Sequence, residues 1–182
     1  MAIGAAVVIP DIGLFVVIKH FEKERDLIKN AEFIIIDKQE MMLHMYDYLG
    51  NLTMEYPIAC GKNVGNKQRQ GDMRTPEGVF RISEIEDASG WSHDFNDGEG
   101  EIDSAYGPWF IRLDTPGHSG IGIHGTHIPE TIGTRATEGC IRMNNEDLIR
   151  LKERVYVGMT VVIVPSAEDV KTNVSKQLDS PK

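Results

Sequence analysis

The possible folds of this chain are limited most by a series of short apolar stretches, separated by turn residues, between Glu32 and about Pro165. The stretches are four to eight residues long and rich in β-branched and aromatic side chains, which favour β-strands. Many short strands without repeated helical crossovers predict a mainly β fold, an antiparallel or mixed sandwich or barrel. The predicted strands are 33–36, 41–48, 56–59, 79–82, 109–113, 120–123 and 161–164.

One short α-helix is predicted after Cys140. Asn144 or Asn145 is a good N-cap, and the acidic residues Glu146 and Asp147 complement the helix dipole in the first turn. The apolar face of this helix would consist of Leu148, Ile149 and Leu151.

The sequence divides into three parts. A length of 182 residues suits one domain with an appendage, and we assign residues 31–166 to the domain and 167–182 to a loose polar tail. Residues 1–30 form the N-terminal appendage. Its apolar run contains Asp11 and is shorter than the ~20 residues of a transmembrane helix. A packed helix or strand, a degenerate export or anchor segment, and a start-site artefact all fit this appendage.

Charge and cysteine content exclude several classes of protein. The formal net charge of -9 argues against a nucleic-acid-binding protein, because such proteins use basic patches to neutralise phosphates. Two cysteines, Cys60 and Cys140, are too few for a disulfide framework, and neither has a CxxC partner for structural zinc. A single bridge between them is an open alternative, although it would consume the candidate nucleophile.

An acidic segment, residues 84–103, contains no lysine or arginine. A calcium site there would use Asp94, Asn96, Asp97 and Glu99, but these residues do not follow the EF-hand register. The main alternative is a solvated surface loop. A functional version of that alternative is a long loop that forms a wall or lid over the active site, with Trp91 and Phe95 inside it.

The chemistry of the chain centres on His124 and Cys140, which lie sixteen residues apart. A free thiol has a pKa of about 8.5, so a catalytic cysteine needs a nearby imidazole to ionise it. The carbonyl of Gly125 is placed to hold the second imidazole nitrogen in the right tautomer. The amides of Gly139 and Cys140 are candidates for an oxyanion hole, because Gly139 has no side chain to block the approach.

Two other interpretations compete for the same residues. Zinc is one, with His118, His124, His127 and Cys140 as plausible ligands, although two histidines three apart on one strand would point to opposite faces. We therefore predict no metal and no other cofactor. Arg142 would either bind a substrate carboxylate or pair with a carboxylate such as Glu138.

The segments His124-Gly125-Thr126 and Thr137-Glu138-Gly139-Cys140-Ile141-Arg142-Met143 together resemble the signature of the YkuD-type L,D-transpeptidases. Two upstream turns, Cys60-Gly61-Lys62 and Thr75-Pro76-Glu77-Gly78-Val79-Phe80, are similar to turns of the same family. The chain departs from the signature in two ways: Thr137 stands where serine is commoner, and Glu138 stands where histidine or lysine is common.

The resemblance implies a β-rich enzyme in which Cys140 is the nucleophile, His124 moves the proton and the Gly125 carbonyl orients the imidazole. Arg142, Thr137, Thr126 and Trp91 are the expected substrate-binding residues. The implied substrate is the meso-diaminopimelate carbonyl of a peptidoglycan tetrapeptide stem. The enzyme releases D-alanine and transfers the acyl group to an amine, in a 3→3 cross-link or on an anchored lipoprotein. Family members are also acylated by carbapenems.

Three functional alternatives follow from the resemblance. The thioester transfers to an amine, or water hydrolyses it in an L,D-carboxypeptidase or cross-link hydrolase. A non-catalytic wall-binding domain would keep the fold without the chemistry. The resemblance implies a place in the cell envelope, periplasmic or otherwise extracytoplasmic, and a role in cell-wall biogenesis and cell shape. The sequence leaves the acceptor amine and the oligomeric state open.

Overall fold

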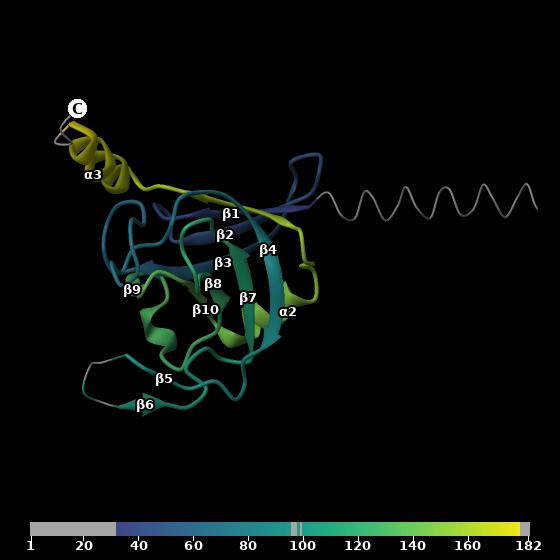
Figure 1. The fold of residues 1–182 in the computed structure, drawn as a ribbon. Helices are drawn as coiled ribbons and strands as arrows, with labels where there is room; N and C mark the ends of the chain where they lie inside the picture. Colours follow the sequence, from purple (N-terminus) through teal and green to yellow (C-terminus); the bar gives the residue numbers. More distant parts are fainter. Residues whose placement is uncertain (1–31, 96–97, 99, 179–182) are drawn as a thin grey trace, which may run out of the picture.

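The computed structural model describes residues 32–95, 98 and 100–178 (Figure 1). Our interpretations of residues 1–30 therefore lie outside the described residues. The long strands are β1 (Phe33–Asp37), β2 (Met42–Tyr46), β3 (Leu52–Gly61), β4 (Gly78–Asp87), β7 (Trp109–Asp114) and β11 (Thr160–Val164). The short elements are β5 (His93–Asp94), β6 (Glu101–Ile102), β8 (Gly122–His124), η1 (Pro129–Thr131), β9 (Arg135–Thr137) and β10 (Ile141–Met143).

The main sheet closes on itself. Within the described residues its strand order is β10-β8-β7-β4-β11-β1-β2-β3-β9, and β10 also pairs with β3, so that the strands from β10 to β3 form a barrel. Most pairs are antiparallel, whereas β1–β11, β8–β10 and β3–β9 are parallel. The prediction of a mainly β, mixed, barrel-like fold is confirmed.

Alternation of side chains explains why these sequences form barrel strands. In β1, β2 and β11 every second residue is buried, so one side of each strand faces the barrel interior and the other faces outward. Burying each of these aliphatic side chains contributes about 1.5–3 kcal/mol. The inward set from these strands is Ile34, Ile36, Leu43, Met45, Val161 and Ile163.

The predicted helix is α2 (Asn145–Lys152), and Asn144 is its N-cap. Leu148 and Leu151 are fully buried, but Ile149 is exposed, so its assignment to the apolar face with these two leucines was wrong. Successive helical residues turn by about 100°, and the side chain after Leu148 therefore points away from the barrel.

The prediction of a loose tail was wrong for residues 167–178, which form a second helix, α3 (Ala167–Leu178). Ser166 and Asp169 form a reciprocal cap: the Asp169 amide donates to Ser166 Oγ over 3.1 Å and the Ser166 amide donates to Asp169 Oδ2 over 2.8 Å. Asp169 is fully buried and ion-paired with Lys38 and Arg135, so tertiary contacts order a sequence that looks solvated.

The described residues of the acidic segment include three stretches of β-strand. Its first residues continue β4 as far as Asp87, and later ones form the β5–β6 hairpin, which projects from the barrel at the lower edge of Figure 1. The calcium interpretation depends on Asn96, Asp97 and Glu99, which lie outside the described residues.

Candidate active site

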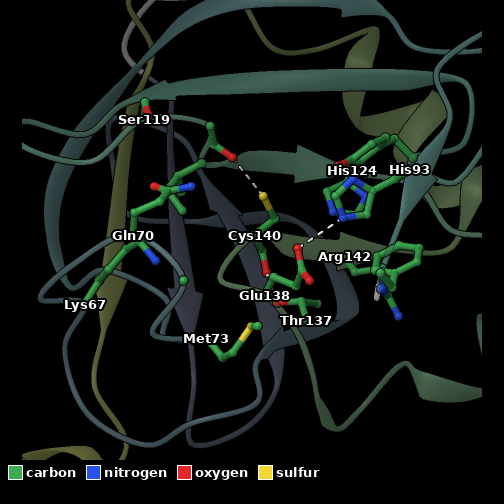
Figure 2. A pocket seen from close by; sticks show the side chains of 15 residues that line it. Lys67, Gln70, Met73, His93, Ser119, His124, Thr137, Glu138, Cys140 and Arg142 are labelled. Carbon is green, nitrogen blue, oxygen red and sulfur yellow. Dashed lines mark hydrogen bonds and ion pairs between the residues drawn. The ribbon is translucent and has the colours of Figure 1, made fainter. Parts of the chain in front are cut away.

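Two neighbouring strands bring the predicted catalytic residues together. Strands β8 and β10 are parallel, with Ile123 opposite Ile141 and His124 opposite Arg142. Cys140 immediately precedes β10 and therefore lies beside Gly122, at the start of β8. Figure 2 shows the side chains of Cys140 and His124 at the same cavity.

The cavity has a volume of about 440 Å³. Residues of β5, β8, β9 and β10 line it together with residues of the loops that connect the strands. Its described lining residues are Lys67, Gln70, Gly71, Met73, His93, Phe95, Tyr106, Ser119, Gly120, Ile121, His124, Thr137, Glu138, Cys140 and Arg142.

The imidazole of His124 is held in one orientation. Its Nδ1–H donates a hydrogen bond to the Gly125 carbonyl over 2.6 Å, which leaves the lone pair on Nε2. The ring is buried, stacks on Phe110 at 5.7 Å between centroids, and meets the edge of Tyr106 at 4.9 Å. The geometry expected of the Gly125 carbonyl is therefore present.

Asn145, the first residue of α2, fixes the segment that carries this carbonyl. Its side-chain Oδ1 accepts from the Thr126 amide over 2.8 Å and its Nδ2 donates to the Thr126 carbonyl over 3.0 Å. The Gly125 amide donates to the Tyr106 carbonyl over 2.8 Å. A Cβ on Gly125 would lie 2.1 Å from Asn145 Oδ1, so this close approach requires glycine.

Two glycines of the 120–122 turn surround the thiol of Cys140. The Sγ–H donates to the Gly120 carbonyl over 3.2 Å, and the Gly122 amide donates to the sulfur. Cys60 is the other cysteine; both are free thiols, so the alternative of a bridge between them was wrong.

Burial sets the protonation state of the candidate catalytic residues Cys140 and His124. It raises the pKa of the Cys140 thiol to about 11, an effect that the Gly122 amide opposes only in part. Burial lowers the pKa of His124 to about 3, although the bond to the Gly125 carbonyl acts in the other direction. At neutral pH the protein therefore holds a thiol and a neutral imidazole, whereas we expected the imidazole to ionise the cysteine beforehand.

The backbone of the 137–140 segment is tightly held. Thr137 Oγ1 accepts from the Gly139 amide over 3.1 Å and donates to the Cys140 carbonyl over 2.6 Å. Thr75 Oγ1 donates to the Gly139 carbonyl over 2.9 Å. Because the Gly139 amide is already engaged, the Cys140 amide is the remaining candidate of the two expected oxyanion donors.

Arg142 lies at the base of the cavity with only 2% of its surface exposed. Its Nη1 donates to Thr131 Oγ1 over 2.9 Å, and its buried Nε has no hydrogen-bond partner among the described residues. The alternative ion pair with Glu138 is not what the structure shows: the carboxylate of Glu138 pairs with His93 at 3.2 Å.

Two predicted substrate-binding residues lie outside the cavity lining. Trp91 packs behind the wall, against Phe110 at 5.5 Å and Tyr106 at 6.0 Å. Thr126 is buried under α2 and is held by Asn145. The acidic segment does supply part of the wall, through His93 and Phe95.

Sequence reasoning missed three side chains that shape the cavity, Lys67, His93 and Tyr106, whereas Phe95 lies in the wall as expected of the acidic segment. The first is a lysine with 4% exposure whose Nζ pairs with Asp72 at 3.0 Å. The sequence carries only a weak signal for these residues. His93 lies inside the acidic segment and Tyr106 follows it, and only the fold places them at the cavity that holds Cys140.

The zinc interpretation receives no support from the positions of its ligands. Among the described residues there is no group of three or more His, Cys, Asp or Glu side chains that could hold a metal ion. His127 turns away toward the backbone, with Nδ1 3.3 Å from the Ala105 carbonyl.

None of the helices in the described residues is long and apolar enough to cross a membrane.

Comparison with known proteins identifies one family for this chain. The family model for the YkuD L,D-transpeptidase catalytic domain matches residues 31–164. YqjB and YkuD of Bacillus subtilis, both named putative L,D-transpeptidases, are each 33% identical to this chain, over 110 and 116 residues. These matches cover 59% and 63% of the chain and 57% and 56% of the relatives, so the chain spans little more than half their length.

A solved structure shows the same fold. The NMR structure of the catalytic domain from the Enterococcus faecium L,D-transpeptidase has a TM-score of 0.55 and 24% identity, and the match covers 74% of this chain and 98% of that one. The fold and site define a β-barrel domain with a cysteine–histidine centre. The chain belongs to the L,D-transpeptidase catalytic domain family, which confirms the resemblance in its sequence.

Proposed function

We propose that the protein is a peptidoglycan L,D-transpeptidase that works by cysteine acyl transfer. The observation that carries this proposal is the fixed His124 tautomer, with Nδ1 on the Gly125 carbonyl at 2.6 Å and Nε2 free for a proton, beside the Cys140 thiol in one cavity. Membership of the family supports the same chemistry.

The neutral pair dictates how the reaction begins. As the Cys140 sulfur attacks the meso-diaminopimelate carbonyl of the donor stem, its proton passes to His124 Nε2. The Cys140 amide stabilises the oxyanion, and the imidazolium then protonates the departing amine of D-alanine. The products are a thioester on Cys140 and free D-alanine.

An amine or water completes the reaction from this thioester. Transfer to an amine makes a 3→3 cross-link or anchors a lipoprotein, whereas hydrolysis gives a tripeptide. The cavity of about 440 Å³ has room for water beside the thioester, which favours the second candidate function, an L,D-carboxypeptidase or cross-link hydrolase. We place either activity at peptidoglycan in the cell envelope, with a role in cell shape. Arg142 and Thr137 would shape the site for the donor stem.

Incubation with disaccharide-tetrapeptide tests the proposal. We expect dimer, tripeptide and free D-alanine from the wild type, no turnover from Cys140→Ala, and nearly none from His124→Ala, all followed by liquid chromatography and mass spectrometry. Turnover by folded Cys140→Ala would refute the thiol mechanism. A wild type that binds the stem without releasing D-alanine would instead support the wall-binding alternative.

A further inference from the structure

The wall of the cavity contains a carboxylate–imidazole pair that the acylation chemistry does not use. Glu138 Oε2 lies 3.2 Å from His93 Nε2, and both residues line the cavity that holds Cys140. Glu138 is the one carboxylate among the described lining residues. Its negative charge therefore gives this part of the wall a preference for a cation.

The pair lies on one side of the nucleophile. In Figure 2, His93 and Arg142 are on the opposite side of Cys140 from Lys67, Gln70 and Ser119, and the Glu138 carboxylate turns toward His93. Glu138 is two residues from Cys140 in the chain and lines the same cavity, and its charge adds to the effect of burial in raising the pKa of Cys140.

The rest of the environment fixes the pair while leaving it open to water. The His93 ring meets Phe95 at 4.5 Å and Tyr106 at 5.5 Å between centroids, in edge contacts. The side chains of His93 and Glu138 are 29% and 36% exposed. An incoming cation can therefore reach the carboxylate, and a proton lost there can pass through the imidazole to solvent.

The geometry points to Glu138 and His93 as the subsite for the acceptor, a primary ammonium group that attacks the thioester on Cys140. This inference rests on the proposed function. The acceptor binds as a cation beside Glu138 and loses one proton to water through His93. Its nitrogen then attacks the thioester carbonyl, the C–S bond breaks, and the second proton passes through His124 Nε2 to the Cys140 thiolate. Thioester and amine thus become amide and thiol.

The partition of one acyl-enzyme between products tests this subsite. Disaccharide-tetrapeptide serves as donor and cationic acceptor, and the dimer-to-tripeptide ratio is independent of the acylation rate. Hydroxylamine, which is uncharged near neutral pH, serves as a second acceptor in parallel reactions. We compare Glu138→Gln with Glu138→Asp, which keeps the charge, and with Glu130→Gln, which removes an exposed carboxylate from η1.

Glu138→Gln should lower the dimer-to-tripeptide ratio about tenfold, the effect of one charge-assisted hydrogen bond, and leave the hydroxamate-to-tripeptide ratio unchanged. Glu138→Asp should recover much of the ratio, and Glu130→Gln should match the wild type. An unchanged dimer ratio in Glu138→Gln, or an equal loss with both acceptors, would overturn the subsite. Absence of a thioester adduct in the wild type would instead refute the proposed function, and the subsite with it.

Discussion

At the residue scale, the catalytic pair differs from a preformed ion pair. Burial keeps Cys140 protonated and His124 neutral, with pKa values of about 11 and about 3. In the proposed mechanism the thiol therefore becomes nucleophilic only when a substrate carbonyl is in place to accept the sulfur while the imidazole takes the proton. Such a site protects the cysteine from small electrophiles between turnovers.

Alkylation of the free enzyme measures this protonation state. The rate of Cys140 modification by iodoacetamide should rise with pH and reach half its limit well above pH 9, because only the thiolate reacts. Mass spectrometry of the peptide that contains Cys140 separates its modification from that of the buried Cys60. A rate already at its plateau at pH 7 would contradict the neutral pair and indicate a thiolate–imidazolium pair.

The brace between Asn145 and Thr126 gives a second test at this scale. Asn145→Ala removes both hydrogen bonds that fix the segment with the Gly125 carbonyl. We expect the acylation rate to fall about a hundredfold, the effect of a displacement of about 1 Å in a catalytic group. Asn144→Ala is the matched control, since the Asn144 side chain makes no capping hydrogen bond to α2. Equal rates in the two variants would disprove the role of the brace.

At the scale of elements, α3 holds one wall of the cavity although it follows the residues that match the family model. Asp169 Oδ1 accepts from the Gly65 amide over 2.6 Å, and Asn173 Oδ1 accepts from the Asn66 amide over 2.9 Å. The segment that begins there includes Lys67, which lines the cavity. Ordering of α3 is therefore coupled to the shape of the active site.

Removal of Asp169 should be costly because it leaves Lys38, which is 1% exposed, with one fewer carboxylate. Asp169→Ala should lower the free energy of unfolding by about 3 kcal/mol, as expected when one partner of a buried ion pair is lost. Arg150→Ala, which removes only exposed pairs on α2, should cost about 0.5 kcal/mol or less. Urea denaturation measures both. A loss for Asp169→Ala no larger than that of Arg150→Ala would contradict this account of α3.

An element could be predicted from the sequence where a local residue pattern specifies it, and less well where tertiary contacts order it. Strands such as β1 and β11 carry their own signal, since alternating burial leaves an apolar pattern in the sequence. The helix α3 has only the cap formed by Ser166 and Asp169 as a local signal, and buried ion pairs order the rest. The same holds for the residues of the site. Adjacent sequence motifs predicted Cys140 and His124, whereas His93 lies in the same cavity only because of where the fold places β5.

At the scale of the whole molecule, closure of the barrel connects site geometry to stability. Strand β10 pairs with both β8 and β3, so the strand that follows Cys140 is also the strand that closes the sheet. Several ionisable groups are buried only in the folded protein, so their pKa values change on unfolding. His124 and Asp169 both have lowered pKa values in the folded state, so the unfolded chain binds protons more readily.

Acid should therefore destabilise the protein in two stages. An unfolded histidine has a pKa of about 6.5, so stability should fall as the pH drops from there toward about 3, the folded value of His124. Burial alone would raise the pKa of Asp169, but hydrogen bonds from Gly65 and Ser166 lower it overall, and its contribution is lost at still lower pH. Urea titrations between pH 7 and pH 4 measure the first stage; constant or increasing stability on acidification would contradict it.

The most direct test of the central claim is the mass of the protein after it meets an acyl donor. Cys140 of the wild type should gain the mass of a carbapenem, and rapid quenching after addition of disaccharide-tetrapeptide should trap the stem less D-alanine on the same residue. Folded Cys140→Ala should gain neither mass. Release of D-alanine by this variant, or a folded wild type that forms no adduct with either compound, would contradict a thiol enzyme built on Cys140, His124 and the Gly125 carbonyl.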